Sequence, residues 1–178
     1  MQGLVVPHNP EWRDAFETEA KLIADALGLN VVAIHHIGST AIPNIYAKPV
    51  IDVLVEVRDI NEVCGQDPAM KSLGYEVMGE FGIPGRRYFR KDDTAGMRTH
   101  QIHVFESGSP HVARHLAFRE YLTAHTDTAL EYSDLKRRLA AEHPEDPDSY
   151  MDGKDEFIKD IDRRAELWRK PRLLSDLG

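Results

Sequence analysis

The chain has 178 residues, of which 42% are apolar, and its 22 basic and 30 acidic side chains give a formal net charge of −8. This length suits one compact domain, and the excess of acidic residues argues against attraction to nucleic-acid phosphates, so nucleic acid is not an expected partner. The single cysteine, Cys64, excludes an internal disulfide framework. No stretch approaches the roughly 20 apolar residues that cross a bilayer. We therefore expect a cytoplasmic protein that does not enter a membrane.

The first part of the chain alternates predicted helices and strands. Asn9 and Pro10 are typical of a helix start, and apolar residues at helical spacing follow until Gly28 ends the run. Residues 31–37 and 50–57 are rich in apolar and β-branched residues, which predicts two strands. Residues 59–73 are expected to form a helical crossover. Short turns then favour antiparallel pairing of three further strands, at 75–78, 86–90 and 98–105.

From Ser109-Pro110 onward the pattern is helical. Apolar residues recur at helical spacing in three segments, 111–125, 127–141 and 149–168. We therefore predict an α+β fold, with a mixed β-sheet and flanking helices. One domain would span residues 1–178, with a sheet region at 1–107 and a helical region at 108–178.

One stretch places an isolated aspartate in an apolar strand. In IDVLVEV, residues 51–57, alternate side chains face the core, whereas Asp52 belongs to the other set. A carboxylate there must be solvated, paired or bound to a cation, because its unpaired burial is costly. The Gly38-Ser39 turn can aim backbone N–H groups and the Ser39 and Thr40 hydroxyls at a phosphate, with a divalent metal ion between phosphate and Asp52. The alternative is an ordinary turn, followed by an aspartate that caps the strand or pairs with an arginine.

The string HIGSTAIPNIYAKPVIDVLVEV resembles the signature of GrpB family proteins. The likeness continues over nearly the whole chain, through GRRYFRK, RTHQIHVFE, RHLAFREYL, YSDLKRRLA and SYMDGKDEFI. GrpB proteins are placed in the nucleotidyltransferase superfamily, which includes DNA polymerase β and the aminoglycoside nucleotidyltransferases. The resemblance implies a GrpB-like domain with a nucleotidyltransferase-like mixed β-sheet, flanking helices and a C-terminal helical region. It also implies a nucleoside triphosphate as substrate and a divalent metal ion, Mg²⁺ or Mn²⁺, as cofactor.

The pattern of this superfamily is a Gly-Ser turn, a strand with two alternating acidic residues, and a third carboxylate on a neighbouring strand. Gly38 and Ser39 match the turn, and Asp52 matches the first acidic residue. The second acidic position is occupied by Leu54, which removes an expected metal ligand. Glu56 lies on the same face of the strand as Asp52 and is a candidate substitute ligand.

The third position falls on the strand RTHQIHVFE, where His100 and His103 stand in place of a carboxylate. Imidazole suits zinc, manganese or iron better than magnesium, so a histidine beside Asp52 would change the metal preference towards a transition metal. His100 and His103 differ by three positions and point to opposite faces, so at most one of them is expected to join Asp52. His36 lies on the same side as Gly38 and is expected to support the turn.

Several basic residues are candidates for phosphate contacts. Lys48 lies in the loop after the Gly-Ser turn, and Arg86 and Arg87 follow a glycine-rich turn. Lys136 and Lys154 occur in the predicted helical region, which the superfamily resemblance implies would cover the nucleotide.

Three interpretations of function remain open. In the first, the chain is a nucleotidyltransferase in which Asp52 holds the metal ion, His103 supplies a second ligand or a base, and a small-molecule or protein acceptor receives the nucleotidyl group. In the second, Leu54 marks a nucleotide-binding or folding-assistance module that has lost catalysis. The third is a metal-dependent hydrolase. A further carboxylate near Asp52, from Glu56 or Glu106, would favour the nucleotidyltransferase.

Overall fold

The computed structural model describes residues 4–177, and its centre is a five-stranded sheet with the strand order β1-β2-β5-β4-β3. β2 pairs antiparallel with β1 and parallel with β5, and β4 pairs antiparallel with both β3 and β5. The sheet is therefore mixed, and the antiparallel pairing of the three later strands is confirmed. The strands are β1 (Val31–Ile37), β2 (Ile51–Val57), β3 (Glu76–Val77), β4 (Arg87–Asp92) and β5 (Arg98–Glu106).

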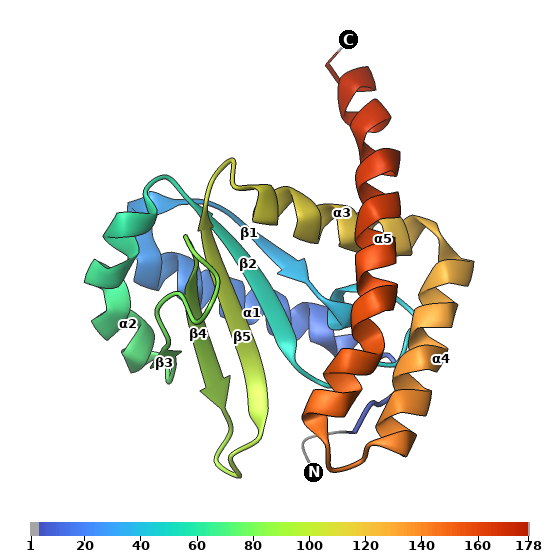
Figure 1. Ribbon diagram of the computed structural model, residues 1–178. Helices are drawn as coiled ribbons and strands as arrows, with labels where there is room; N and C mark the ends of the chain where they lie inside the picture. Colours follow the sequence, from blue (N-terminus) through green and yellow to red (C-terminus); the bar gives the residue numbers. More distant parts are fainter. Residues whose placement is uncertain (1–3, 178) are drawn as a thin grey trace.

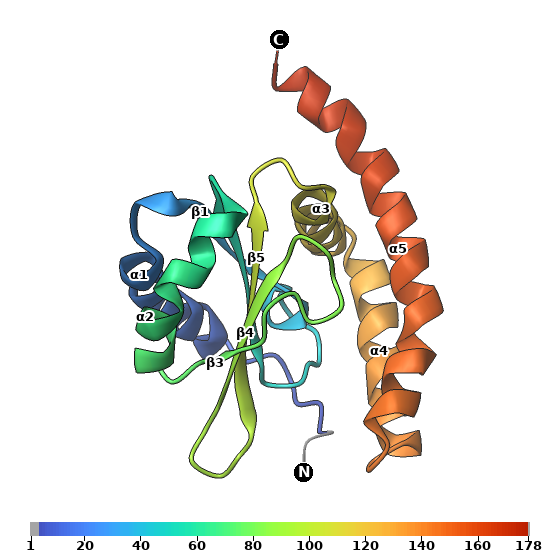
Figure 2. The ribbon, with the colours of Figure 1, turned by 60° about the vertical axis from the view of Figure 1, so that its left-hand side comes forward.

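Helices cover both faces of the sheet (Figures 1 and 2). On one side lie α1 (Glu11–Leu27) and α2 (Asp67–Ser72). On the other side lie α3 (Pro110–Ala124), α4 (Thr126–Glu142) and α5 (Pro147–Ser175), and the C-terminal end of α5 projects beyond the sheet (Figure 1). Three short 3₁₀ turns complete the chain, at Gly28–Asn30, Ser39–Ala41 and Ile60–Gln66. The predicted α+β class is confirmed.

Local signals explain the ends of the first and last helices. The Asn9 side chain accepts a hydrogen bond from the Glu11 backbone N–H at 3.0 Å, as expected for a polar residue beside a helix start. Gly28, at φ +70°, ends α1. Helix α5 continues past the predicted end at residue 168, because Pro171 is accommodated inside its last turns instead of terminating it.

The strand faces divide the apolar core. Val53 and Val104 belong to the main cluster, between the sheet and α1. Leu54 and Phe105 face the opposite way and pack with Val112 of α3. A third cluster joins α3, α4 and α5 to the loop before β2. Within residues 4–177, none of the helices has the length and apolar character needed to cross a membrane.

Candidate functional site between the sheet and the C-terminal helices

Strand β2 directs Asp52 to the side of the sheet that carries the C-terminal helices. Its neighbours Ile51 and Val53 are buried in the core cluster with α1. Because side chains alternate along a strand, Asp52 points the other way, and its side chain remains 26% exposed. Asp52 is therefore outside the main core, as predicted, and is accessible to a ligand.

The Gly38-Ser39 turn lies directly against Asp52. Strands β1 and β2 pair with Ile37 opposite Asp52. Gly38 has φ +73° and ψ −171°, a conformation that is essentially restricted to glycine. A Cβ atom on Gly38 would lie 2.7 Å from the Oδ2 atom of Asp52. Glycine is therefore required here both by the backbone and by the close approach of the carboxylate.

The two hydroxyl groups of the turn have different surroundings. Ser39 lies within hydrogen-bonding reach of Tyr132 on α4, on the same side of the sheet as Asp52. Thr40 is buried, and its hydroxyl donates to the Val50 carbonyl oxygen at 3.1 Å and contacts the Nε2 atom of His36 at 2.9 Å. The structure therefore does not offer the Thr40 hydroxyl to a phosphate, whereas His36 supports the turn as expected.

His103 of β5 contacts Asp52 and is itself held by Arg86. The Nε2 atom of His103 lies 3.3 Å from Asp52 Oδ1, and an Arg86 guanidinium nitrogen lies 3.3 Å from His103 Nδ1. A guanidinium group can only donate, so Nδ1 accepts this bond. The ring proton is consequently on Nε2, which donates to Asp52. His103 therefore acts in this structure as a donor that positions Asp52, and it does not present a lone pair to a metal ion beside that carboxylate.

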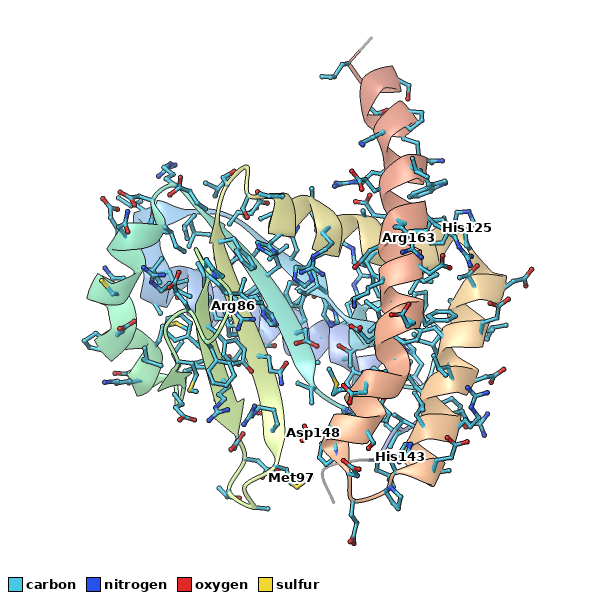
Figure 3. All side chains as sticks on the ribbon, in the orientation of Figure 1. Arg86, Met97, His125, His143, Asp148 and Arg163 are labelled. Atoms are coloured by element: carbon cyan, nitrogen blue, oxygen red, sulfur yellow. The ribbon has the colours of Figure 1, made fainter. Side chains whose placement is uncertain are left out.

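Arg86 is engaged within the fold. Its side chain is buried beside β4 and β5 (Figure 3), where it also donates to the carbonyl oxygens of Glu80 and Phe81. These bonds hold the glycine-rich loop before β4 against His103. The predicted phosphate contact of Arg86 therefore needs correction, because the side chain is buried and each of its three nitrogens already donates a hydrogen bond within the fold.

Two other predicted residues lie on the opposite face of the sheet. His100 pairs in register with Ile51 and faces α1, where its Nε2 atom lies 3.9 Å from a carboxylate oxygen of Glu19. Arg87 pairs with Val104, which belongs to the α1 core. Side-chain alternation thus separates His100 and Arg87 from Asp52, and the structure does not support their predicted roles as metal ligand and phosphate contact.

Within the described residues, no second carboxylate joins Asp52 in a metal-binding group. Glu56 lies further along β2, where its carboxylate contacts His35 Nε2 at 2.6 Å. Glu106 accepts a hydrogen bond from the Ile60 backbone N–H. Among residues 4–177, no group of three His, Cys, Asp or Glu side chains could hold a metal ion. The expectation that Glu56 replaces the missing ligand is therefore not supported.

Leu54 occupies the second acidic position of the superfamily pattern as a core residue. It is 0% exposed and packs with Ile37, Phe105, Val112 and Leu116 beneath α3. Because this environment is apolar, a carboxylate could not be accommodated there without a large cost. The second metal ligand of the superfamily pattern is thus replaced here by a residue that packs the core beneath α3.

Three lysines gather on the Asp52 side of the sheet. Lys136 of α4 is 1% exposed, and its ammonium group has no hydrogen-bond partner in the described part of the chain. Burial, together with the nearby Lys154 ammonium, lowers the pKa of Lys136 to about 7. The Lys136 Nζ atom lies 4.4 Å from the centre of the Tyr132 ring, which places it behind the residue that contacts Ser39.

Lys154 of α5 and Lys48 flank the ring of Tyr150. Their Nζ atoms lie 4.4 Å and 4.1 Å from its centre. Burial and the charge of Lys48 lower the pKa of Lys154 to about 8, although the charge of Asp52 opposes the change. Within the described chain, neither lysine forms an ion pair with a carboxylate. Lys48, a predicted phosphate contact, therefore lies together with Lys154 at the ring of Tyr150.

The sheet and its helices define a nucleotidyltransferase-like fold. The chain superposes on a crystal structure of the Cid1 poly(U) polymerase with a TM-score of 0.53 at 10% identity, covering 77% of this chain and 44% of Cid1, a likeness that shows the fold alone. More specifically, the chain belongs to the GrpB family, whose model, described as GrpB protein, matches residues 4–164.

Two relatives illustrate this membership. The UPF0157 protein YqkA of Bacillus subtilis is 47% identical over 168 residues, which are 94% of this chain and 48% of YqkA, so the chain spans about half of that relative. The crystal structure of conserved protein GrpB from Enterococcus faecalis matches with a TM-score of 0.88 at 42% identity, covering 93% of this chain and 99% of that one.

Proposed function

We propose that this chain binds a nucleoside triphosphate between the sheet and helices α4 and α5 and, with one divalent metal ion, transfers its nucleotidyl group to an acceptor. The observation that carries this proposal is the cluster of Lys48, Lys136 and Lys154, which lies on the Asp52 side of the sheet and has no carboxylate partners within residues 4–177. Ammonium groups gathered in this way repel one another, and a bound polyphosphate would offset both the repulsion and the burial. The fold shared with Cid1, a poly(U) polymerase, supports the same class of ligand.

One metal ion fits the residues present better than two. Asp52 supplies a single carboxylate, and Mg²⁺ is commonly held by one or two carboxylates together with substrate phosphates and water. Bound there, Mg²⁺ or Mn²⁺ would neutralise phosphate charge. A second ion lacks a ligand because the second acidic position is occupied by Leu54, which has no ligating group. Lys136 and Lys154 would supply the remaining positive charge.

In the proposed reaction, a hydroxyl oxygen or amine nitrogen of a small-molecule or protein acceptor forms a bond to the α-phosphorus. The bond from that phosphorus to the oxygen bridging the β-phosphate breaks, and pyrophosphate leaves with the electron pair. The acceptor proton passes to water. In this scheme Gly38 and His103 position the carboxylate of Asp52, and the lysines bind the departing phosphates.

Nucleotide binding without transfer is a second candidate function. The buried Leu54 favours it, because two-metal phosphoryl transfer depends on carboxylates that hold both ions. The two candidates share the same binding site and differ only in turnover.

Isothermal titration with ATP, GTP, CTP and UTP, in Mg²⁺ or Mn²⁺, tests the binding site. We expect the wild type to bind at least one nucleotide, Asp52→Ala to abolish the dependence on metal, and Lys136→Met to weaken binding about tenfold or more. Lys159→Met removes the same charge from an exposed position on α5 and should leave affinity unchanged. Absence of binding by the wild type, or equal binding by Lys136→Met, would reject the site. Pyrophosphate release on addition of candidate acceptors then separates transfer from binding.

A further inference from the structure

A cavity of about 540 Å³ opens at the edge strand β1, between α1 and α3. This volume is within the usual range of small-molecule sites. Neither Asp52 nor the three lysines line this cavity. Thr40 lines the cavity, whereas the neighbouring Ser39 lies near Tyr132 on the side of the proposed nucleotide site. The same turn therefore forms part of the cavity and of the proposed nucleotide site.

His36 lines this cavity and has a free hydrogen-bond acceptor. Thr40 has one hydroxyl proton, which it donates to the Val50 carbonyl oxygen at 3.1 Å. It must therefore accept its second bond from His36 Nε2, at 2.9 Å. Nδ1 of His36 then carries a lone pair, and it has no hydrogen-bond partner within residues 4–177. Phe16 stacks on the ring with a centroid distance of 4.8 Å and holds its orientation.

The surroundings keep His36 uncharged. Burial, followed by the positive groups of Arg119 and His8, lowers its pKa to about 4, although Asp52 opposes this change. His8 also lines the cavity, and its buried Nδ1 atom has no partner in the part of the chain described. Because the Nδ1 atom of His8 is shielded from solvent, the unused imidazole acceptor of the cavity is Nδ1 of His36.

Arg119 supplies the positive charge of the cavity. One guanidinium nitrogen donates to the His36 backbone carbonyl oxygen at 3.0 Å, which fixes the side chain against β1 at His36. A second nitrogen lies 3.8 Å from a Glu120 oxygen, beyond hydrogen-bonding distance, and the side chain is 28% exposed. At the rim, Arg13 and Glu17 pair with each other at 3.3 Å. Arg119 therefore retains donors for an anion.

We propose that this cavity binds a small organic acid that carries a hydroxyl or ammonium donor next to its carboxylate. The carboxylate is bound by Arg119, and the donor is bound by Nδ1 of His36. This pairing uses the two groups that the fold brings together and leaves incompletely bonded. The site is distinct from the proposed nucleotide site, because neither Asp52 nor the lysines line it, although the two share the turn that contains Ser39 and Thr40.

Lactate, alanine and propionate form a matched set of probes, since they share a carbon skeleton and differ in carrying a hydroxyl, an ammonium or no donor. In ¹⁵N-edited NMR titrations of the full chain, we expect lactate, alanine or both to shift signals of the cavity residues in a saturable way. Propionate, which leaves His36 Nδ1 unpaired, should bind about tenfold more weakly or not at all. Whichever of lactate and alanine binds identifies the donor as hydroxyl or ammonium.

Arg119→Gln keeps a donor for the His36 carbonyl and removes the charge, so it should abolish these shifts. Thr123→Phe, at the cavity wall, should block binding while retaining Arg119 and His36. Arg114→Gln makes the same change on α3 outside the cavity and should bind like the wild type, as should Asp52→Ala. Equal binding of propionate and lactate, unchanged binding by Arg119→Gln, or no shifts at the cavity with any probe would overturn the proposal.

Discussion

Replacing Gly38 by alanine tests the close approach between the turn and Asp52. At φ +73° and ψ −171°, Gly38 occupies a region nearly closed to other residues, so alanine there should cost about 1–3 kcal/mol in backbone strain. The new Cβ atom would also lie 2.7 Å from Oδ2, 3.1 Å from Cβ and 3.2 Å from Cγ of Asp52. The whole Asp52 side chain would have to move, and not only its tip.

Gly28 provides a matched control. It has φ +70° and ψ −147°, and a Cβ atom added there meets nothing within 4 Å. Gly28→Ala should therefore introduce the backbone strain alone. Differential scanning calorimetry should show both variants less stable by about 1–3 kcal/mol, or about 2–12 °C in Tm for a chain of this length, with the larger loss in Gly38→Ala.

The two variants should also differ in ligand binding. We expect only Gly38→Ala to weaken metal-dependent nucleotide binding in the titration, because only that substitution displaces the Asp52 carboxylate. Equal losses of stability together with unchanged nucleotide affinity in Gly38→Ala would refute the reasoning.

Three further predictions concern buried groups. Burial lowers the pKa of Lys136 to about 7, so above that pH the unfolded chain binds more protons than the folded chain. The free energy of unfolding should therefore rise between about pH 7 and pH 9, by up to about 1.4 kcal/mol per pH unit. Urea titrations should show a smaller rise in Lys136→Met, and a stability that falls over this window would contradict the burial argument. Leu54→Asp should lower the free energy of unfolding by more than about 4 kcal/mol, whereas Leu54→Met should lower it by less than about 1.5 kcal/mol. If circular dichroism melts show a stable Leu54→Asp variant, the position tolerates a carboxylate and the argument is wrong. Glu19→Gln leaves the ammonium of Lys91 without its carboxylate partner and should destabilise the chain by about 2 kcal/mol or more. Nucleotide affinity, measured by titration, should not change, because the Glu19–Lys91 pair lies on the face of the sheet opposite Asp52.

Local patterns in the sequence were sufficient to predict that Asp52 and the Gly38-Ser39 turn lie together. Alternation along residues 51–57 separates Asp52 from the core, and the Gly38-Ser39 turn has to lie near it once the two flanking strands pair. The same alternation indicates that only one of His100 and His103 can face Asp52. Which of them does so depends on the parallel register between β2 and β5, which joins strands far apart in the sequence and leaves no local signal.

The surroundings of the site depended on tertiary contacts. Arg86 follows a glycine-rich turn, which favours a role in anion binding, but the folded loop directs its donors to carbonyl groups and to His103. Helical spacing identifies Tyr132 as core, and only the packing of α4 against the turn brings it to Ser39. Lys136 belongs to a predicted helix, but its burial without a partner results from the way α4 and α5 pack over the sheet.

A crystal structure of the chain with Mn²⁺ and a non-hydrolysable nucleoside triphosphate would test the central claim most directly. Anomalous scattering locates each manganese ion independently of the nucleotide. We predict one manganese ion on Asp52, with the phosphates between Ser39 and the ammonium groups of Lys136 and Lys154. A nucleotide bound away from this cluster, or manganese held by side chains other than Asp52, would contradict the account.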